Sequence, residues 1–173
     1  MWVPADSADR AGGNREERSR TGVAPMDYEQ IKAGLSQVVP FNRHLGIEIV
    51  EVGEGRGVSR LPEAPHLLNH VATQHAAALF GAGKAASGAA MVGAFAAMMG
   101  RFTPLARGAE IRYLKPARGP ITATATVSGD PATLRSRMDA DGRIEFQVDV
   151  SLEEASGVKV AEMNVAWNLR KNA

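Results

Sequence analysis

The chain contains no cysteine among its 173 residues. Disulfide bonds, thiolate metal sites and cysteine nucleophiles are therefore excluded together. A protein without disulfides suits the reducing cytoplasm, and we expect this one to act there. The four histidines have no ligand-like spacing, so we expect no metal site either.

An excess of charge of one sign is also lacking, because 20 basic residues are matched by 19 acidic ones and leave a net charge of +1. Nucleic acids and acidic membrane surfaces attract proteins with a strong positive field. Neither is expected as a partner here. Residues 1–22 mix acidic and basic side chains without an apolar stretch, which is not the pattern of a secretory signal.

The first part of the chain is poor in residues that a core would bury. Residues 1–25 are rich in Arg, Asp, Gly and Ser, and we expect them to form a disordered tail. Residues 26–173 are long enough to build one domain with its own core, and two domains are not expected.

One long apolar run is present. Between His75 and Arg101 the only charged side chain is Lys84, and Ala and Gly make up most of the run. Such a run predicts either a helix wrapped by the rest of the domain or a membrane span. The lysine and the scarcity of Leu, Ile and Val favour the wrapped helix. We expect Thr73 to cap this helix and Gly100 to end it.

Outside this run, apolar residues recur at every second position, which is typical of half-buried strands. The predicted strands cover residues 46–52, 56–61, 109–113, 121–127, 144–152 and 158–169. A glycine turn at 53–55 joins the first two into a hairpin. In the last strand the apolar phase shifts between Val160 and Met163, which predicts a bulge near Ala161.

Two shorter helices are expected beside the long one. Asp27 is a suitable cap for a helix that Pro40 stops. Asp130 followed by Pro131 is typical of another helix start, and we expect this helix to reach Met138. Small residues along the long helix would let strands approach it closely. These are Gly81, Gly83, Ser87, Gly88 and Gly93.

This order of elements predicts an α+β domain in which an antiparallel sheet of about six strands wraps around one long central helix, the hot-dog arrangement. Further features are Asn69, His75 six positions later, the Leu79–Phe80 pair and the segment 110–127. With these features the sequence resembles the hot-dog acyl-CoA thioesterase superfamily. It is most similar to the branch of the phenylacetate-pathway thioesterase and to a related group of bacterial hot-dog proteins.

The resemblance implies an activity, hydrolysis of an acyl thioester. In the family, the backbone N–H after the histidine polarises the thioester carbonyl, and a carboxylate nine positions after the histidine activates water. In this sequence these positions are Ala76 and Lys84. Negative charge develops on oxygen during this reaction, and a helix N-terminus stabilises it. The implied site residues are Asn69, His75, Ala76 and Lys84, with no cofactor other than the CoA moiety of the substrate.

A lysine at the carboxylate position leaves three roles open for Lys84. In the first role, its amine extends to a polar opening or pairs with a carboxylate of a second subunit. Alternatively it holds a carbonyl or carboxylate of the acyl group. In the third role, burial lowers its pKa until the neutral amine acts as a base. The alternative to hydrolysis is therefore a protein that binds an acyl thioester or another apolar ligand without cleaving it.

Other residues near the predicted site either take part in binding or catalysis or are ordinary solvent-exposed side chains. Lys115 and Arg118 flank a turn that the resemblance places near the CoA phosphates, which such cations would bind. His66 and His70 are candidates for the entrance of the site, and Glu63 for a substitute carboxylate. Family sites lie between two subunits, so the resemblance implies a homodimer, with pairing into a tetramer left open.

Overall fold

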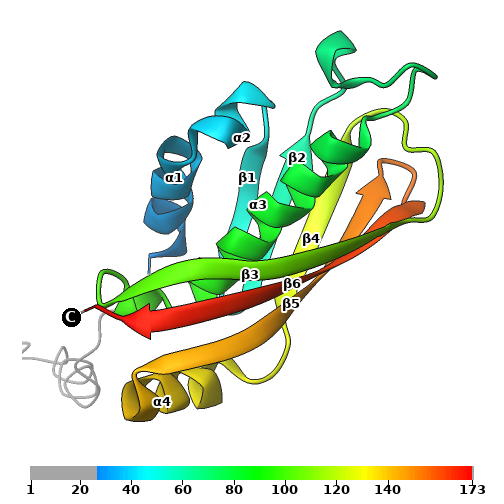
Figure 1. The fold of residues 1–173 in the computed structure, drawn as a ribbon. Coiled ribbons are helices and arrows are strands. Elements are labelled where there is room, and N and C mark those ends of the chain that lie inside the picture. Colours follow the sequence, from blue (N-terminus) through cyan, green and yellow to red (C-terminus); the bar gives the residue numbers. More distant parts are fainter. Residues whose placement is uncertain (1–26, 173) are drawn as a thin grey trace, which may run out of the picture.

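Six antiparallel strands form a single sheet that curls around one long helix, α3 (Ala76–Ala94), in the computed structural model (Figure 1). The structure describes residues 27–172. Along the sheet the strands follow the order β1-β2-β4-β5-β6-β3. They are β1 (Glu48–Gly53), β2 (Arg56–Leu61), β3 (Phe102–Tyr113), β4 (Ile121–Val127), β5 (Arg143–Glu154) and β6 (Lys159–Lys171). The α+β hot-dog fold is confirmed, whereas the tail predicted for residues 1–25 lies outside the described residues.

Shorter helical elements complete the described part of the chain. They are α1 (Tyr28–Val38), α2 (Pro40–His44), the 3-10 turns η2 (Pro65–Leu67) and η3 (Ala96–Met98), and α4 (Pro131–Asp141). Asp27 caps α1 as predicted, since its carboxylate accepts hydrogen bonds of 3.1 Å from the backbone of Glu29 and Gln30. Asp130 caps α4 in the same way by accepting a 2.9 Å hydrogen bond from the Thr133 N–H.

Two of these helices differ in extent from the expectation. α4 continues past Met138 to Asp141, where Gly142 in the left-handed conformation (φ 67°) ends it. Pro40 follows α1 as predicted, but it also opens α2, a single turn that is too short to show a helical period. None of the described helices is long and apolar enough to cross a membrane.

The sheet approaches α3 so closely that glycine is required at some contacts. A Cβ atom on Gly93 would overlap the backbone carbonyl of Gly53, the last residue of β1. One on Gly83 would lie 2.7 Å from the Met163 sulfur. A Cβ atom on Gly88, by contrast, would meet nothing within 4 Å. The predicted close approach is therefore confirmed at Gly83 and Gly93, and Gly88 lies where the sheet does not cover the helix.

The prediction that the long helix extends to Gly100 is wrong, because α3 ends at Ala94. Phe95, the next residue, is fully buried, and its ring centroid lies 5.8 Å from that of Phe102 and 5.3 Å from that of Phe146. Packing of this ring against two strands takes the chain out of the helical path. The apolar composition continues beyond that point, so the sequence shows no break there. Gly100 (φ 81°) instead turns the chain into β3.

Strand β3 forms a free edge of the sheet, because β6 is its only partner among the described strands. It has 12 residues, although the sequence predicted a strand only over 109–113. Pro104 and Gly108 interrupt the pattern, and most side chains on both faces are exposed, so no alternation is visible. Leu105 is 59% exposed and Tyr113 is 47% exposed. A long edge with exposed apolar side chains is a surface on which another strand can pair.

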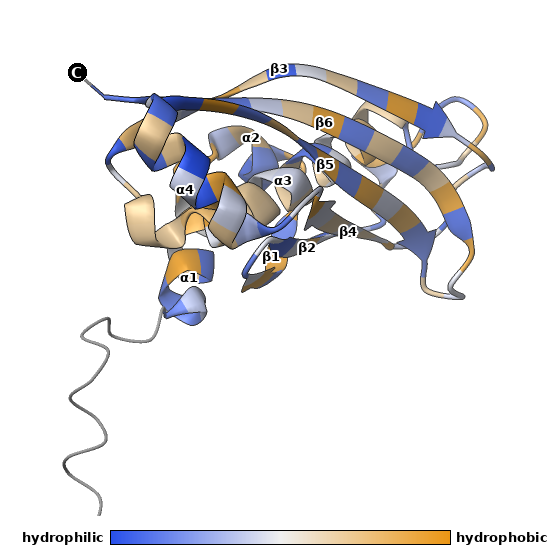
Figure 2. Ribbon diagram, turned by 90° about the horizontal axis from the view of Figure 1, so that it is seen from below, coloured by the Kyte–Doolittle hydropathy of each residue, from blue (hydrophilic) through white to orange (hydrophobic). Residues whose placement is uncertain are grey.

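The last two strands follow the predicted alternation. Hydrophilic and hydrophobic residues alternate in bands along β5 and β6 (Figure 2). Leu152 pairs with Ala161 and Glu153 pairs with Lys159, so Val160 is the extra residue of a bulge. The bulge predicted near Ala161 is confirmed to within one residue.

Candidate functional site

His75, not Thr73, caps α3. The His75 Nδ1 atom accepts a hydrogen bond of 3.0 Å from the Ala77 N–H, and the helix starts at Ala76. The prediction of Thr73 as the cap is wrong because the loop uses its hydroxyl, which accepts a 2.8 Å hydrogen bond from the Asn69 side-chain amide. The His75 side chain therefore serves the helix start, where it remains exposed.

Asn69 orders the loop that precedes α3. Its side-chain oxygen accepts hydrogen bonds of 3.1 Å from the N–H groups of Val71 and Thr73. Between them, Ala72 has a φ of 56°, in the left-handed region that costs energy for a residue with a Cβ atom. The contacts of Asn69 hold this strained turn, which leads directly into the first turn of the helix.

A cavity of about 390 Å³ opens at the N-terminus of α3. Its wall combines the loop before the helix, the first turn of the helix and the segment that follows β3. The lining includes Asn69, Gln74, Ala76, Leu79, Tyr113 and Lys115. A mostly apolar wall with a few polar groups is typical of sites for small molecules.

The Ala76 N–H is an unpaired donor at this cavity. It donates no hydrogen bond to any described residue, because the first N–H groups of a helix have no partner within the helix. The dipole of the 19-residue helix favours negative charge at the same end. The Tyr113 hydroxyl donates a 3.0 Å hydrogen bond to the Ala76 carbonyl and so ties the end of β3 to this turn. Together these features can stabilise an oxyanion.

Sequence reasoning did not single out Gln74, which is only 2% exposed. Its Nε2 atom donates hydrogen bonds of 2.9 Å to the carbonyls of Pro62 and Gly119, so it joins three loops behind the cavity. Its Oε1 atom is buried and accepts no hydrogen bond from the described residues. A buried acceptor without a partner is costly. A glutamine in a loop belongs to no recognisable pattern, so only the folded chain shows this role.

Lys84 lies on the side of α3 that the sheet leaves uncovered, together with Phe80 and Gly88. Its Nζ atom is 3.7 Å from the centroid of the Trp167 ring on β6. Burial lowers the pKa of Lys84 to about 8. The face of the Trp167 ring tends to raise this pKa, because it attracts the charged form of the amine. No carboxylate of the described residues pairs with Lys84.

Lys84 and Ala76 are separated along the helix. Eight residues at 1.5 Å each place them about 12 Å apart along the axis. Lys84 does not line the cavity that contains the Ala76 N–H. In this structure the Lys84 amine lies at Trp167 and not at the cavity that contains the Ala76 N–H.

The two predicted phosphate-binding cations have different positions. Lys115 lines the cavity. Arg118 does not, although its backbone N–H donates a 2.9 Å hydrogen bond to Glu154 and so fixes the turn. The cavity therefore brings Lys115 to the same place as Asn69 and Ala76.

The candidate site residues in the loop before α3 do not line the cavity at the start of this helix. Glu63 is exposed, and its carboxylate accepts a 3.2 Å hydrogen bond from the Gly119 N–H. His66 and His70 are also exposed. In the described part of the chain no group of three or more His, Asp or Glu side chains is placed to hold a metal ion.

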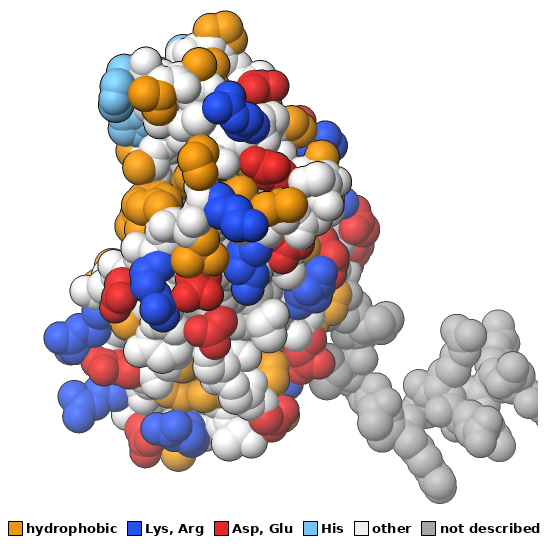
Figure 3. All heavy atoms as spheres, turned by 90° about the vertical axis from the view of Figure 1, so that its right-hand side faces the viewer, with side chains coloured by type: hydrophobic (Ala, Val, Ile, Leu, Met, Phe, Trp, Pro, Cys, Tyr) orange, Lys and Arg blue, Asp and Glu red, His pale blue; other side chains and the backbone are white. Residues whose placement is uncertain are grey.

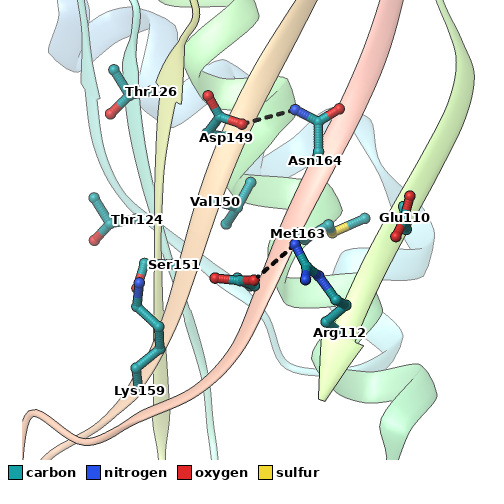
Figure 4. A pocket seen from close by; sticks show the side chains of 11 residues that line it. Glu110, Arg112, Thr124, Thr126, Asp149, Val150, Ser151, Lys159, Met163 and Asn164 are labelled. Atoms are coloured by element: carbon teal, nitrogen blue, oxygen red, sulfur yellow. Dashed lines mark hydrogen bonds and ion pairs between the residues drawn. The ribbon is translucent and has the colours of Figure 1, made fainter. Parts of the chain in front are cut away.

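A second concavity, of about 540 Å³, lies on the outer face of the sheet (Figure 4). Some of the charged groups there are paired, since Arg112 lies 3.2 Å from Glu162 and Asn164 donates a 2.8 Å hydrogen bond to Asp149. Acidic and basic side chains also interleave over the face drawn in Figure 3. The lining of this concavity comes from strands and contains no helix N-terminus, so the cavity at α3 is the better candidate site.

A family model matches most of the chain. It covers residues 28–169 and is described as a domain of unknown function, DUF4442. None of the curated protein sequences matches the chain.

Several solved structures have a similar fold, and three of them illustrate the range of sequence identity and TM-score. PA5026 from Pseudomonas aeruginosa, a protein of unknown function and probable thioesterase, is 24% identical, and the match covers 83% of this chain and 95% of that one, with a TM-score of 0.73. The PaaI protein from the phenylacetic acid degradation operon of E. coli is 19% identical over 84% and 93%, with a TM-score of 0.65. A variant of the thioesterase SAV0944 from Staphylococcus aureus is 16% identical over 76% and 99%, with a TM-score of 0.61. These similarities establish a shared fold.

Proposed function

The chain belongs to the DUF4442 family, and we propose that it is a cytoplasmic thioesterase that binds an acyl-CoA at the N-terminus of α3 and hydrolyses it. The observation that carries this proposal is the Ala76 N–H, which has no acceptor among residues 27–172 and lies at the start of a 19-residue helix, where Ala76 borders a cavity. A thioester carbonyl placed there becomes more electrophilic, and the oxyanion formed by attack is stabilised. The name of the structural neighbour PA5026, a probable thioesterase, agrees with this chemistry.

The rest of the cavity suits both the acyl group and the CoA moiety of such a substrate. Leu79 and Tyr113 supply apolar surface, and Gln74 supports the wall behind them through the two hydrogen bonds that it donates. Lys115 lines the same cavity, and as a cation it would bind the phosphates. His75 contributes through the helix start that it caps, and Asn69 through the loop that it orders.

The proposed site includes residues of two subunits. Lys84 and Ala76 of one chain are about 12 Å apart along the helix axis. Both lie on the uncovered side of α3. The Tyr113 hydroxyl of β3 bonds to the Ala76 carbonyl, and Lys84 contacts Trp167 of β6, the strand next to the free edge. A second copy that pairs with this edge in antiparallel fashion would bring its own α3 against the first and place the partner's Lys84 near the Ala76 N–H. The proposed enzyme is therefore a homodimer, and pairing of dimers into a tetramer is compatible with it.

In this arrangement the neutral amine of Lys84 acts as the general base. It takes a proton from water, and the hydroxide attacks the carbonyl carbon. The oxyanion forms at the Ala76 N–H, the carbon–sulfur bond then breaks, and the lysine ammonium returns its proton to the CoA thiolate. With a pKa of about 8, about one lysine in ten is neutral at pH 7, which is enough for slow turnover.

The dependence of thiol release on pH tests this function. The neutral amine becomes more abundant as pH rises, so the rate should increase about tenfold per pH unit below the pKa and level off above about 8. Lys84→Gln should abolish this increase, whereas Lys159→Gln, a change of an exposed lysine outside the cavity, should retain it. The assay covers short, long and aromatic acyl-CoAs, with spontaneous hydrolysis subtracted. Absence of thiol release from all of them would refute the enzyme.

The second candidate is a protein that binds an acyl thioester without cleaving it. The 3.7 Å contact between Lys84 and the Trp167 ring favours this candidate, because the ring stabilises the ammonium form, which cannot accept a proton. In that case the chain lacks only the carboxylate, and Lys84→Glu should produce thiol release in a protein that previously only bound acyl-CoA. Loss of an existing activity in Lys84→Glu would instead show that the lysine takes part in hydrolysis.

A further inference from the structure

A group of arginines surrounds an open concavity of about 630 Å³, well away from the cavity at α3. Three elements contribute to it: the C-terminal end of α4, the beginning of β5 and the end of β6, with one residue from β3. The arginines are Arg107, Arg137, Arg143 and Arg170. Asp141 and Glu145 also line it, so its charged side chains carry a net charge of +2, four positive and two negative.

Two of these arginines are direct neighbours across the sheet. Arg143 pairs with Arg170 in the register of β5 and β6, next to the pair formed by Ile144 and Leu169. The apolar pair is buried in the core, so the alternation of a strand turns both arginines to the outer face. Like charges directly opposite each other on neighbouring strands destabilise a sheet. An anion bound between them would remove this cost.

Three of the four guanidinium groups donate no hydrogen bond to the residues that the structure describes. Arg107 lies 2.7 Å from Glu145, which also accepts a 3.0 Å hydrogen bond from Asn168. The Glu145 carboxylate is thereby engaged, and these contacts, first the hydrogen bond from Arg107, hold its pKa below the usual range. The positive charge of Arg143 also contributes to the lowered pKa of Glu145. No ion pair with the described residues is made by Arg137, Arg143 or Arg170.

We propose that this concavity binds a small soluble compound that carries a diphosphate group. Guanidinium groups bind phosphate oxygens in pairs, and three free ones from three different elements converge here. The opposed Cβ atoms of Arg143 and Arg170 are roughly 5 Å apart, so their side chains can hold neighbouring phosphates of one ligand. The concavity is also larger than a single oxyanion requires.

This diphosphate site is separate from the thioester cavity of the same chain. Arg107 lines one site and Tyr113 the other, and the six residue steps from one to the other along β3 span roughly 20 Å. The inference is independent of the proposed hydrolysis, because it uses none of the residues assigned to that reaction.

Calorimetric titration of the full chain with inorganic pyrophosphate and, separately, with ADP tests the proposal at constant ionic strength. We expect saturable binding of one ligand per chain, weakened about tenfold or more in Arg143→Gln/Arg170→Gln, because two charged contacts with the diphosphate are lost. Tighter binding of ADP would identify a nucleotide as the source of the diphosphate, and equal or tighter binding of pyrophosphate would identify the inorganic ion. Both outcomes support the site.

The matched control is Arg60→Gln/Arg112→Gln, which changes the net charge equally but leaves the concavity intact. It should keep the wild-type affinity. Both changes affect exposed side chains, and thermal melting checks that each variant is folded. No saturable binding to the wild type, an unchanged affinity in Arg143→Gln/Arg170→Gln, or an equal loss in the control would overturn the proposal.

Discussion

Replacement of Ala76 by proline should lower the rate of thioester hydrolysis by about 10²–10³-fold and leave the fold intact, because one donor to an oxyanion is lost. Proline has no N–H, so the substitution removes the single group proposed to polarise the carbonyl. It suits the first position of a helix, where the N–H has no helical partner. The preceding residue, His75, already has the extended conformation that a proline requires (φ −67°, ψ 138°).

The matched control for this variant is Ala76→Gly, which keeps the N–H and removes only the methyl group. Thiol release at saturating acyl-CoA should remain within a few-fold of the wild type in the glycine variant. Thermal melting of both variants confirms that they are folded. A proline variant with the activity of the wild type would show that another group polarises the carbonyl, and the proposed role of α3 would then be abandoned.

The second large effect concerns the packing of the sheet on the helix. Gly93→Ala should reduce the free energy of unfolding by about 3 kcal/mol, because overpacking at a rigid contact is destabilising. The added Cβ atom would overlap the backbone carbonyl of Gly53, and backbone cannot move aside as a flexible side chain does. The better helix propensity of alanine, about 1 kcal/mol, offsets only part of this cost. Urea denaturation monitored by circular dichroism measures the difference.

Gly34→Ala is the control for Gly93→Ala, because it makes the same change at an exposed position of another helix, α1. A Cβ atom there would meet nothing within 4 Å, so the substitution should leave stability unchanged or raise it by up to about 1 kcal/mol. Equal stability of the Gly93→Ala and Gly34→Ala variants would contradict the close contact between α3 and the β1-β2 hairpin.

Much of the fold was predictable because it depends on short-range patterns. Alternation along β4, β5 and β6 reflects one buried and one exposed face, and the caps Asp27 and Asp130 act within one helical turn. The first half of β3 was not predictable, since a free edge strand with two exposed faces has no alternation. The end of α3 also depends on long-range contacts, because Phe95 packs against β3 and β5.

In the candidate site, too, some features follow from local sequence and others from long-range contacts. By itself the sequence determined the α+β hot-dog fold, the wrapped helix and the unusual lysine at position 84, because composition, period and spacing are properties of the chain alone. Only the tertiary structure decided that His75 caps the helix, that Gln74 and Tyr113 border the cavity, and that Lys84 contacts Trp167. These contacts join residues from separate elements, and no local pattern in a sequence encodes which side chains a curled sheet brings together.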